Sequence, residues 1–175
     1  QDLMEAHPVL FPGFTRQPTV SPRYGLNARR DEPYTDPWGC VWATNDDGIT
    51  GAVHGHPLSD WDRLDTYMPP DPATTDGTFP LDWESIAEGV RRRRKSGQLI
   101  AGGLPHGHTF LRLQDIRGYE NLIFDMADDR PELRRLIAMV EEFNYQFVMR
   151  WMALEPDMMT YAEDLGMQVG PMLSP

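Results

Sequence analysis

The sequence has little cysteine, little positive charge and no long apolar run. Its 175 residues contain one cysteine, and 16 lysines and arginines against 27 aspartates and glutamates, for a formal net charge of -11. The single cysteine, Cys40, excludes a disulfide within the chain and favours a reducing compartment. The acidic excess argues against nucleic acid, whose phosphates need basic surface, and against an anionic membrane surface.

No apolar stretch is long enough to cross a bilayer, and the first residues do not have the pattern of a signal peptide. We therefore expect a cytoplasmic protein. The length suits one domain with its own hydrophobic core. The chain begins at Gln1 and ends at Pro175, just after a strand-like stretch, so we expect it to be part of a larger protein.

Frequent prolines set the first 33 residues apart from the rest of the chain. Proline breaks helices and removes a backbone donor from strands, so we expect residues 1–33 to form an extended arm. Residues 34–175 then form the folded domain. Within it, Cys40–Ala43 and Ile49–Val53 flank the turn sequence Asn45-Asp46-Asp47-Gly48, which predicts a β-hairpin.

The second half of the chain predicts a strand, two helices and a second strand. The strands are expected at 98–104 and 157–162, and the helices at 118–127 and 131–155. Strands linked by helices pair in parallel through right-handed crossovers. This pattern indicates an α/β fold, and a barrel suits it better than an open sheet. The sequence contains no Gly-x-Gly-x-x-Gly fingerprint and no P-loop.

Two places combine a carboxylate with a glycine beside an apolar stretch. Asp36 lies in Tyr34-Thr35-Asp36-Pro37-Trp38-Gly39, and Glu163 and Asp164 come directly after the second predicted strand. Carboxylates at the ends of barrel strands are typical of active sites. We expect these two places to belong to one site.

Several short segments, in this order and at this spacing, resemble the uroporphyrinogen decarboxylase family across residues 30–175. The segments are Asp36-Pro37-Trp38-Gly39, His56-Pro57-Leu58-Ser59-Asp60-Trp61, Tyr67-Met68-Pro69-Pro70-Asp71-Pro72, Arg117-Gly118-Tyr119-Glu120-Asn121, and Asp164-Leu165-Gly166 continuing to Gly170–Pro175. The resemblance implies a (β/α)8 TIM barrel, of which this chain would be the N-terminal half. It also implies a carboxyl-lyase that acts on an acidic, tetrapyrrole-type substrate without a cofactor.

The resemblance gives Asp36 the place of the aspartate that contacts the substrate's pyrrole nitrogens. A carboxylate there stabilises positive charge on the ring before carbon dioxide leaves. Asp164 falls near a serine of the family at a strand end. Phe110 or Leu111 stands where the resemblance places the family's substrate tyrosine, and we take Phe110, Arg112 and Glu163 as substrate-binding candidates.

Two His-Gly-His triplets, His54–His56 and His106–His108, place their histidines on one side of an extended segment. Such a pair can bind zinc with a third ligand, for which Glu163 or Asp164 is available. His106 and His108 are the better metal candidates. Alternatively, His108 serves as a general acid or base, which is the role we assign to it with Asp36 and Asp164 as catalytic residues.

Three functions therefore stay open from the sequence. The first is the cofactor-free decarboxylase. The second is a zinc-dependent methyltransferase of the same superfamily, with a corrinoid protein as its partner. The third is a non-catalytic relative that only binds a ligand. A homodimer is compatible with each of them.

Overall fold

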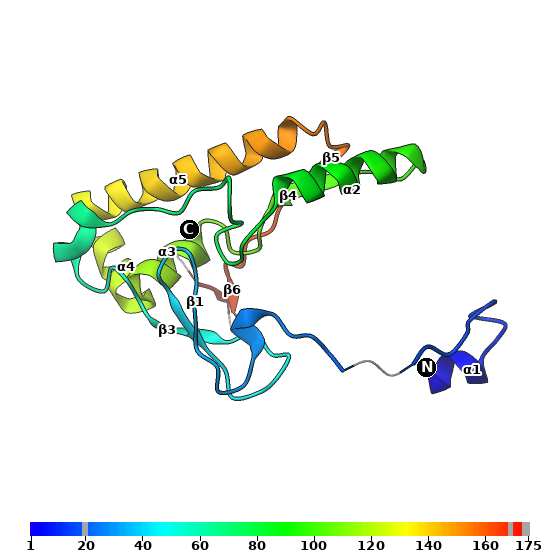
Figure 1. Cartoon of the computed structure of the whole chain (residues 1–175). Coiled ribbons are helices and arrows are strands. Elements are labelled where there is room, and N and C mark those ends of the chain that lie inside the picture. The colour runs from blue at the N-terminus through cyan, green and yellow to red at the C-terminus, as the bar shows by residue number, and fades with distance from the viewer. Residues whose placement is uncertain (19–20, 168–169, 173–175) are drawn as a thin grey trace.

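The computed structural model describes residues 1–18, 21–167 and 170–172 (Figure 1). Its helices are α1 (Asp2–Ala6), η1 (Leu26–Ala28), η2 (Trp61–Thr66), α2 (Trp83–Lys95), α3 (Phe110–Arg117), α4 (Tyr119–Ala127) and α5 (Pro131–Met152). Its strands are β1 (Tyr34–Thr35), β2 (Val41–Ala43), β3 (Ala52–Gly55), β4 (Ala101–Leu104), β5 (Met158–Tyr161), β6 (Gly166–Met167) and β7 (Gly170–Pro171). The end of the last family-like segment, residues 173–175, lies outside the described residues.

Strands β1, β2 and β3 form an antiparallel sheet in that order. The turn between β1 and β2 is the Asp-Pro-Trp-Gly segment, in which the Gly39 N–H donates to the Asp36 carbonyl over 2.8 Å. Gly39 has a φ of +86°, which a residue with a side chain rarely adopts. Pro37 suits the second turn position because its φ is already fixed. The predicted hairpin between Cys40 and Val53 is confirmed by the pairing of β2 with β3.

The core forms where α5 packs on α3, α4 and η2 and on Trp38, which lies in the turn between β1 and β2. Helix α5 lies along one side of the molecule, with α3 and α4 beneath its N-terminal half (Figure 1). Its buried residues recur at three- and four-residue steps, as the sequence predicts for an amphipathic helix. They are Leu133, Leu136, Val140, Phe143 and Phe147.

Strands β4 and β5 pair in parallel and are joined by α3, α4 and α5, so the predicted parallel pairing is confirmed. Gly102 in β4 lies directly against α5. A Cβ at this position would lie 2.7 Å from the Trp151 ring, so only glycine lets the strand approach the helix this closely. Trp83 of α2 packs on the same part of α5, where its ring meets those of Phe147 and Trp151 edge to face.

The expected half of a (β/α)8 TIM barrel is wrong. The strands of the described residues lie in separate sheets of three and two strands, and none of these sheets closes. The physical reason is that β1, β2 and β3 pair with one another as a short antiparallel meander. They therefore add no strand to the parallel pair of β4 and β5, which is left as a two-stranded sheet.

Two local expectations also differ from the structure. The sequence predicts a loop at 105–108 and no helix before residue 118, whereas the structure forms α3 over Phe110–Arg117. Residues 25–33 of the predicted arm pack along the hairpin, where the N–H groups of Gly48 and Gly51 donate to the carbonyls of Ala28 and Asn27.

No helix among residues 1–18, 21–167 and 170–172 is long and apolar enough to cross a membrane.

A buried ion pair ties α3 and α4 to the loop that comes after the hairpin. The Arg117 Nε donates to Asp125 Oδ2 over 2.6 Å, and its Nη1 donates to the carbonyls of Leu58 and Ser59. The guanidinium also lies over the Trp61 ring, with 4.2 Å between its Cζ and the ring centroid. Arg117 thereby fixes the C-terminal end of α3, the helix that carries several residues of the candidate site.

The core can be tested by truncating Leu136, which is fully buried in α5. Leu136→Ala leaves a cavity in the core, so we expect the free energy of unfolding in urea to fall by about 2–5 kcal/mol. Met149→Ala on the same helix removes a side chain that is 48% exposed and should cost much less. Equal losses from the two variants would contradict the assignment of the core face of α5.

Candidate functional site

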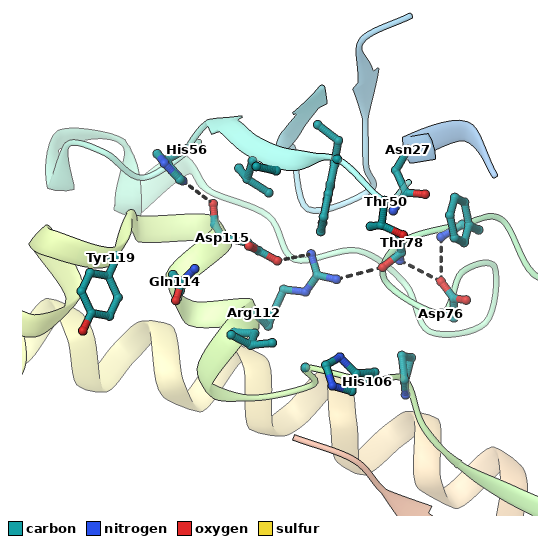
Figure 2. A pocket seen from close by; sticks show the side chains of 18 residues that line it. Asn27, Thr50, His56, Asp76, Thr78, His106, Arg112, Gln114, Asp115 and Tyr119 are labelled. Carbon is teal, nitrogen blue, oxygen red and sulfur yellow. Dashed lines mark hydrogen bonds and ion pairs between the residues drawn. The ribbon is translucent and has the colours of Figure 1, made fainter. Parts of the chain in front are cut away.

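A cavity of about 630 Å³ lies between β3, the loop at 76–79 and the outer face of α3 (Figure 2). Its volume is within the range of cavities that bind small molecules. The lining residues are Asn27, Trp42, Thr50, Gly51, Ala52, Val53, His56, Asp76, Thr78, Phe79, Pro105, His106, Gly107, Leu111, Arg112, Gln114, Asp115 and Tyr119. The ionisable groups among them gather on α3 and on the segments that face it.

Arg112 reaches this cavity from α3 and is held by Asp36. Its Nη1 donates to Asp36 Oδ2 over 2.8 Å, and its Nη2 donates to the Thr78 hydroxyl over 3.0 Å. The side chains of Arg112 and Asp36 are 9% and 0% exposed, so this ion pair is almost dry. Water screens such a pair very little, and the loss of either partner would leave a buried charge.

The Asp36 carboxylate is fully used by its own surroundings. Its Oδ1 accepts the Cys40 backbone N–H over 2.9 Å, and its Oδ2 accepts the Trp42 indole N–H over 3.0 Å as well as Arg112. Asp36 therefore stands behind Arg112 and is not among the residues that line the cavity. It joins the first sheet to α3 and fixes the position of the guanidinium.

Asp115 is the acidic group that faces the cavity from the next turn of α3. Its Oδ2 lies 3.9 Å from Arg112 Nη1, and Figure 2 shows the carboxylate pointing toward that guanidinium. The pKa of Asp115 is raised from 3.8 to about 6, chiefly by burial. Arg112 opposes this rise and Asp36 adds to it. Asp115 thus exchanges a proton close to neutral pH, as a general acid or base must.

Two histidines and a tyrosine complete the polar part of the cavity. The His56 Nδ1 lies 2.7 Å from the Asp115 backbone carbonyl, to which it donates, so Nε2 is the acceptor of the neutral ring. His106 lies on the opposite wall, on the loop after β4, and Tyr119 lies at the other end of the cavity (Figure 2). These three side chains come from three different segments of the chain.

Glu163 holds the start of α3 in place. Its two carboxylate oxygens accept the backbone N–H groups of Thr109 and Leu111, over 2.9 and 3.1 Å. The first N–H groups of a helix have no partner within the helix, so an acidic side chain there stabilises it. His108 lies beside this contact, with Nε2 3.8 Å from Glu163 Oε2 and Nδ1 2.6 Å from the Thr109 hydroxyl.

The structure brings some of the sequence candidates to the cavity and leaves others outside it. Arg112 and His106 line the cavity, whereas Asp36 and Glu163 support residues that do. Phe110 is buried in the core cluster, and its neighbour Leu111 takes a place on the cavity wall. Asp164 is exposed, and its Oδ1 accepts the Gly166 N–H over 3.3 Å.

The histidine triplets do not form a metal centre with the acidic residues around them. No group of three or more His, Cys, Asp or Glu side chains in the described parts of the chain is arranged to hold a metal ion. His54 is exposed while His56 lines the cavity, and His106 lines it while His108 turns toward Glu163. Burial also raises the pKa of Cys40 above its usual range, which keeps this thiol protonated.

Sequence reasoning missed Asp115 and His56 as a facing pair. A helix over 110–117 would have placed Asp115 one turn from Arg112, on the same face. That helix has no strong start signal of its own, because the residue that completes its first turn is Glu163, far away in the sequence. The contact between His56 and α3 is likewise set by tertiary packing.

No protein-family model, curated protein or solved structure matches this chain. The site must therefore be interpreted from its own chemistry. It combines one guanidinium, one carboxyl group that titrates near neutral pH, and two imidazoles around a partly apolar cavity. Such a set can bind an anionic small molecule and transfer a proton to or from it.

The buried pair can be tested by a double-mutant cycle in urea unfolding. Asp36→Asn alone should lower the free energy of unfolding by about 3–5 kcal/mol, because it leaves the Arg112 charge buried without its partner. Arg112→Met alone should cost a similar amount, and the double variant should lose less than the sum of both by more than about 1 kcal/mol. Asp65→Asn, which removes an exposed ion pair with Arg135, should change little. Strictly additive losses would contradict the coupling.

The titration of Asp115 predicts how stability depends on pH. A carboxyl group whose pKa is higher in the folded state stabilises the fold fully below pH 4, and this contribution is lost as the pH rises through about 6. The groups that face Asp115 are Arg112, Asp36, His56 and Glu163.

Asp115→Asn should remove this dependence. Relative to the wild-type chain, the variant should gain up to about 3 kcal/mol between pH 4 and pH 7. The exposed Asp46→Asn should track the wild-type curve. If the free energy of unfolding changed with pH in the same way in the wild type and in Asp115→Asn, the raised pKa would be contradicted.

Proposed function

We propose that this chain is a carboxyl-lyase that removes carbon dioxide from an acidic small molecule bound in the cavity. The observation that carries the proposal is the placement of Arg112 and Asp115 side by side on the cavity wall, with an acid whose pKa is about 6. A cation holds the substrate carboxylate, and an acid that is partly protonated near neutral pH supplies the proton that decarboxylation consumes. No metal or organic cofactor is required by this chemistry.

In the proposed step, the bond between the substrate's carboxylate carbon and its neighbour breaks. Carbon dioxide leaves, and the electron pair of that bond stays on the organic fragment. The Asp115 carboxyl group gives its proton to this fragment, and a proton from water then restores Asp115. The balance is one substrate carboxylate and one proton consumed, with one hydrocarbon group and one carbon dioxide formed.

Within this proposal, the residues around Asp115 have separate roles. Arg112 binds the carboxylate and orients it. Asp36 acts through Arg112, because its buried carboxylate does not line the cavity and accepts a hydrogen bond from the Arg112 guanidinium. An electron-rich ring such as a pyrrole would take the Asp115 proton first, on a ring carbon, and the resulting cationic ring would then take up the electron pair as carbon dioxide leaves. The positive charge that develops on such a ring would be stabilised by the Asp115 carboxylate once it has lost its proton.

The sequence resemblance to the uroporphyrinogen decarboxylase family supports a carboxyl-lyase over other acid–base reactions. The likeness in Asp36–Gly39 and in Arg117–Asn121 falls on segments that border the cavity or hold it together. The zinc-dependent methyltransferase and the ligand-binding relative stay predictions from the sequence, because no contact of the described residues favours either of them.

Release of carbon dioxide from ring-bearing carboxylic acids tests the proposal. Asp115→Asn removes the proton donor and should lower kcat by about 100-fold or more, with the substrate still bound. In the wild-type enzyme, kcat/KM should fall as the pH rises above about 6, because the acid must be protonated. Ala138→Phe, on the exposed side of α5, should keep full activity. Full activity in Asp115→Asn would contradict the assigned acid.

A further inference from the structure

Two aromatic rings on the cavity wall, Trp42 and Phe79, are held by contacts with residues behind them. The Trp42 indole is tied to Asp36 by its N–H, 3.0 Å from Oδ2. The Phe79 ring is stacked on Tyr34, with 5.9 Å between centroids and 21° between the planes. Aromatic rings held in this way favour a flat, apolar ligand body, which gains contact with their faces and edges.

The residues that line the cavity carry little positive charge. Among its lining residues in the described part of the chain, Arg112 is the single lysine or arginine, while Asp76 and Asp115 both carry carboxylates. The Arg112 charge is also balanced from behind by Asp36. A ligand with many carboxylates would meet these acids and the net charge of -11 on the chain, which repel it.

One ligand carboxylate still has donors to meet at Arg112. A guanidinium has five N–H groups, and the contacts in the described residues use one toward Asp36 and one toward Thr78. The remaining N–H groups belong to a side chain that lines the cavity. Arg112 therefore has the donors to bind a single carboxylate while it keeps its partners.

We infer that the substrate of this site is a ring compound with one carboxylate, rather than a polyacid such as a tetrapyrrole. The inference rests on the proposed function and narrows its substrate class. The ring would lie against Trp42 and Phe79, and the carboxylate would meet Arg112. A volume of about 630 Å³ gives ample space for such a molecule.

Isothermal titration calorimetry at about pH 5 tests this inference on the whole chain, with three probes. Benzoate supplies a ring and one carboxylate, acetate supplies the carboxylate alone, and uroporphyrin I supplies a large ring system with many carboxylates. Benzoate should bind at least about tenfold more tightly than acetate, because its ring leaves water for the aromatic walls. Uroporphyrin I should bind more weakly than benzoate. Benzoate no tighter than acetate, or uroporphyrin I tighter than benzoate, would overturn the inference.

A pair of matched variants places the bound probe in the cavity. Ala52 on β3 lines the cavity, so Ala52→Phe fills part of it and should weaken benzoate at least about tenfold. A phenylalanine is well tolerated in a strand, and circular dichroism would verify that the variant folds. Ala138→Phe adds the same ring to α5 outside this cavity and should leave the affinity unchanged. Unchanged benzoate affinity in Ala52→Phe would overturn the site assignment.

The proposed function and this inference fail in different ways. If benzoate binds as expected but no ring acid releases carbon dioxide, the carboxyl-lyase is contradicted and the ligand class is supported. If carbon dioxide is released from uroporphyrinogen and from no ring acid with one carboxylate, the ligand class is overturned and the carboxyl-lyase is supported.

Discussion

The ion pair between Asp36 and Arg112 is the contact on which the rest of the site depends. It joins residues 76 positions apart and is almost completely shielded from water. Three donors meet on one carboxylate: the Cys40 N–H just before β2, the Trp42 indole from β2, and the guanidinium from α3. A buried charge is tolerated only with such partners, so the pair fixes the first sheet and α3 relative to each other.

Helix α3 places Arg112 and a second ionisable side chain, Asp115, at the same cavity. It carries Arg112 and, three residues later, Asp115, and it is held at its start by Glu163 and at its end by Arg117 with Asp125. Because α3 is fixed at both ends, Asp115 is kept in a partly buried place where desolvation favours its protonated form. The burial that stabilises the domain therefore also raises the pKa of the Asp115 carboxyl group to about 6.

The sequence predicted the local elements better than their assembly. The β-hairpin that ends at Val53, the amphipathic face of α5 and the parallel pairing of β4 with β5 are predicted from patterns in the sequence, and they are confirmed. The barrel was wrong because strand pairing between distant segments leaves no local pattern. The acid at residue 115 was missed for a related reason, since α3 is completed by the distant Glu163 carboxylate. The sequence pointed to Arg112, but its partnership with Asp36 required the fold.

Asp36 and Arg112 hold Asp115, the proposed proton donor, at the wall of the cavity. The most direct test is to monitor the Asp115 carboxyl carbon by ¹³C NMR during a pH titration of the wild-type chain. The account predicts a midpoint of about 6, against an ordinary value of 3.8, and a change in that midpoint when a carboxylate ligand fills the cavity. A midpoint close to 4 that no ligand moves would contradict it.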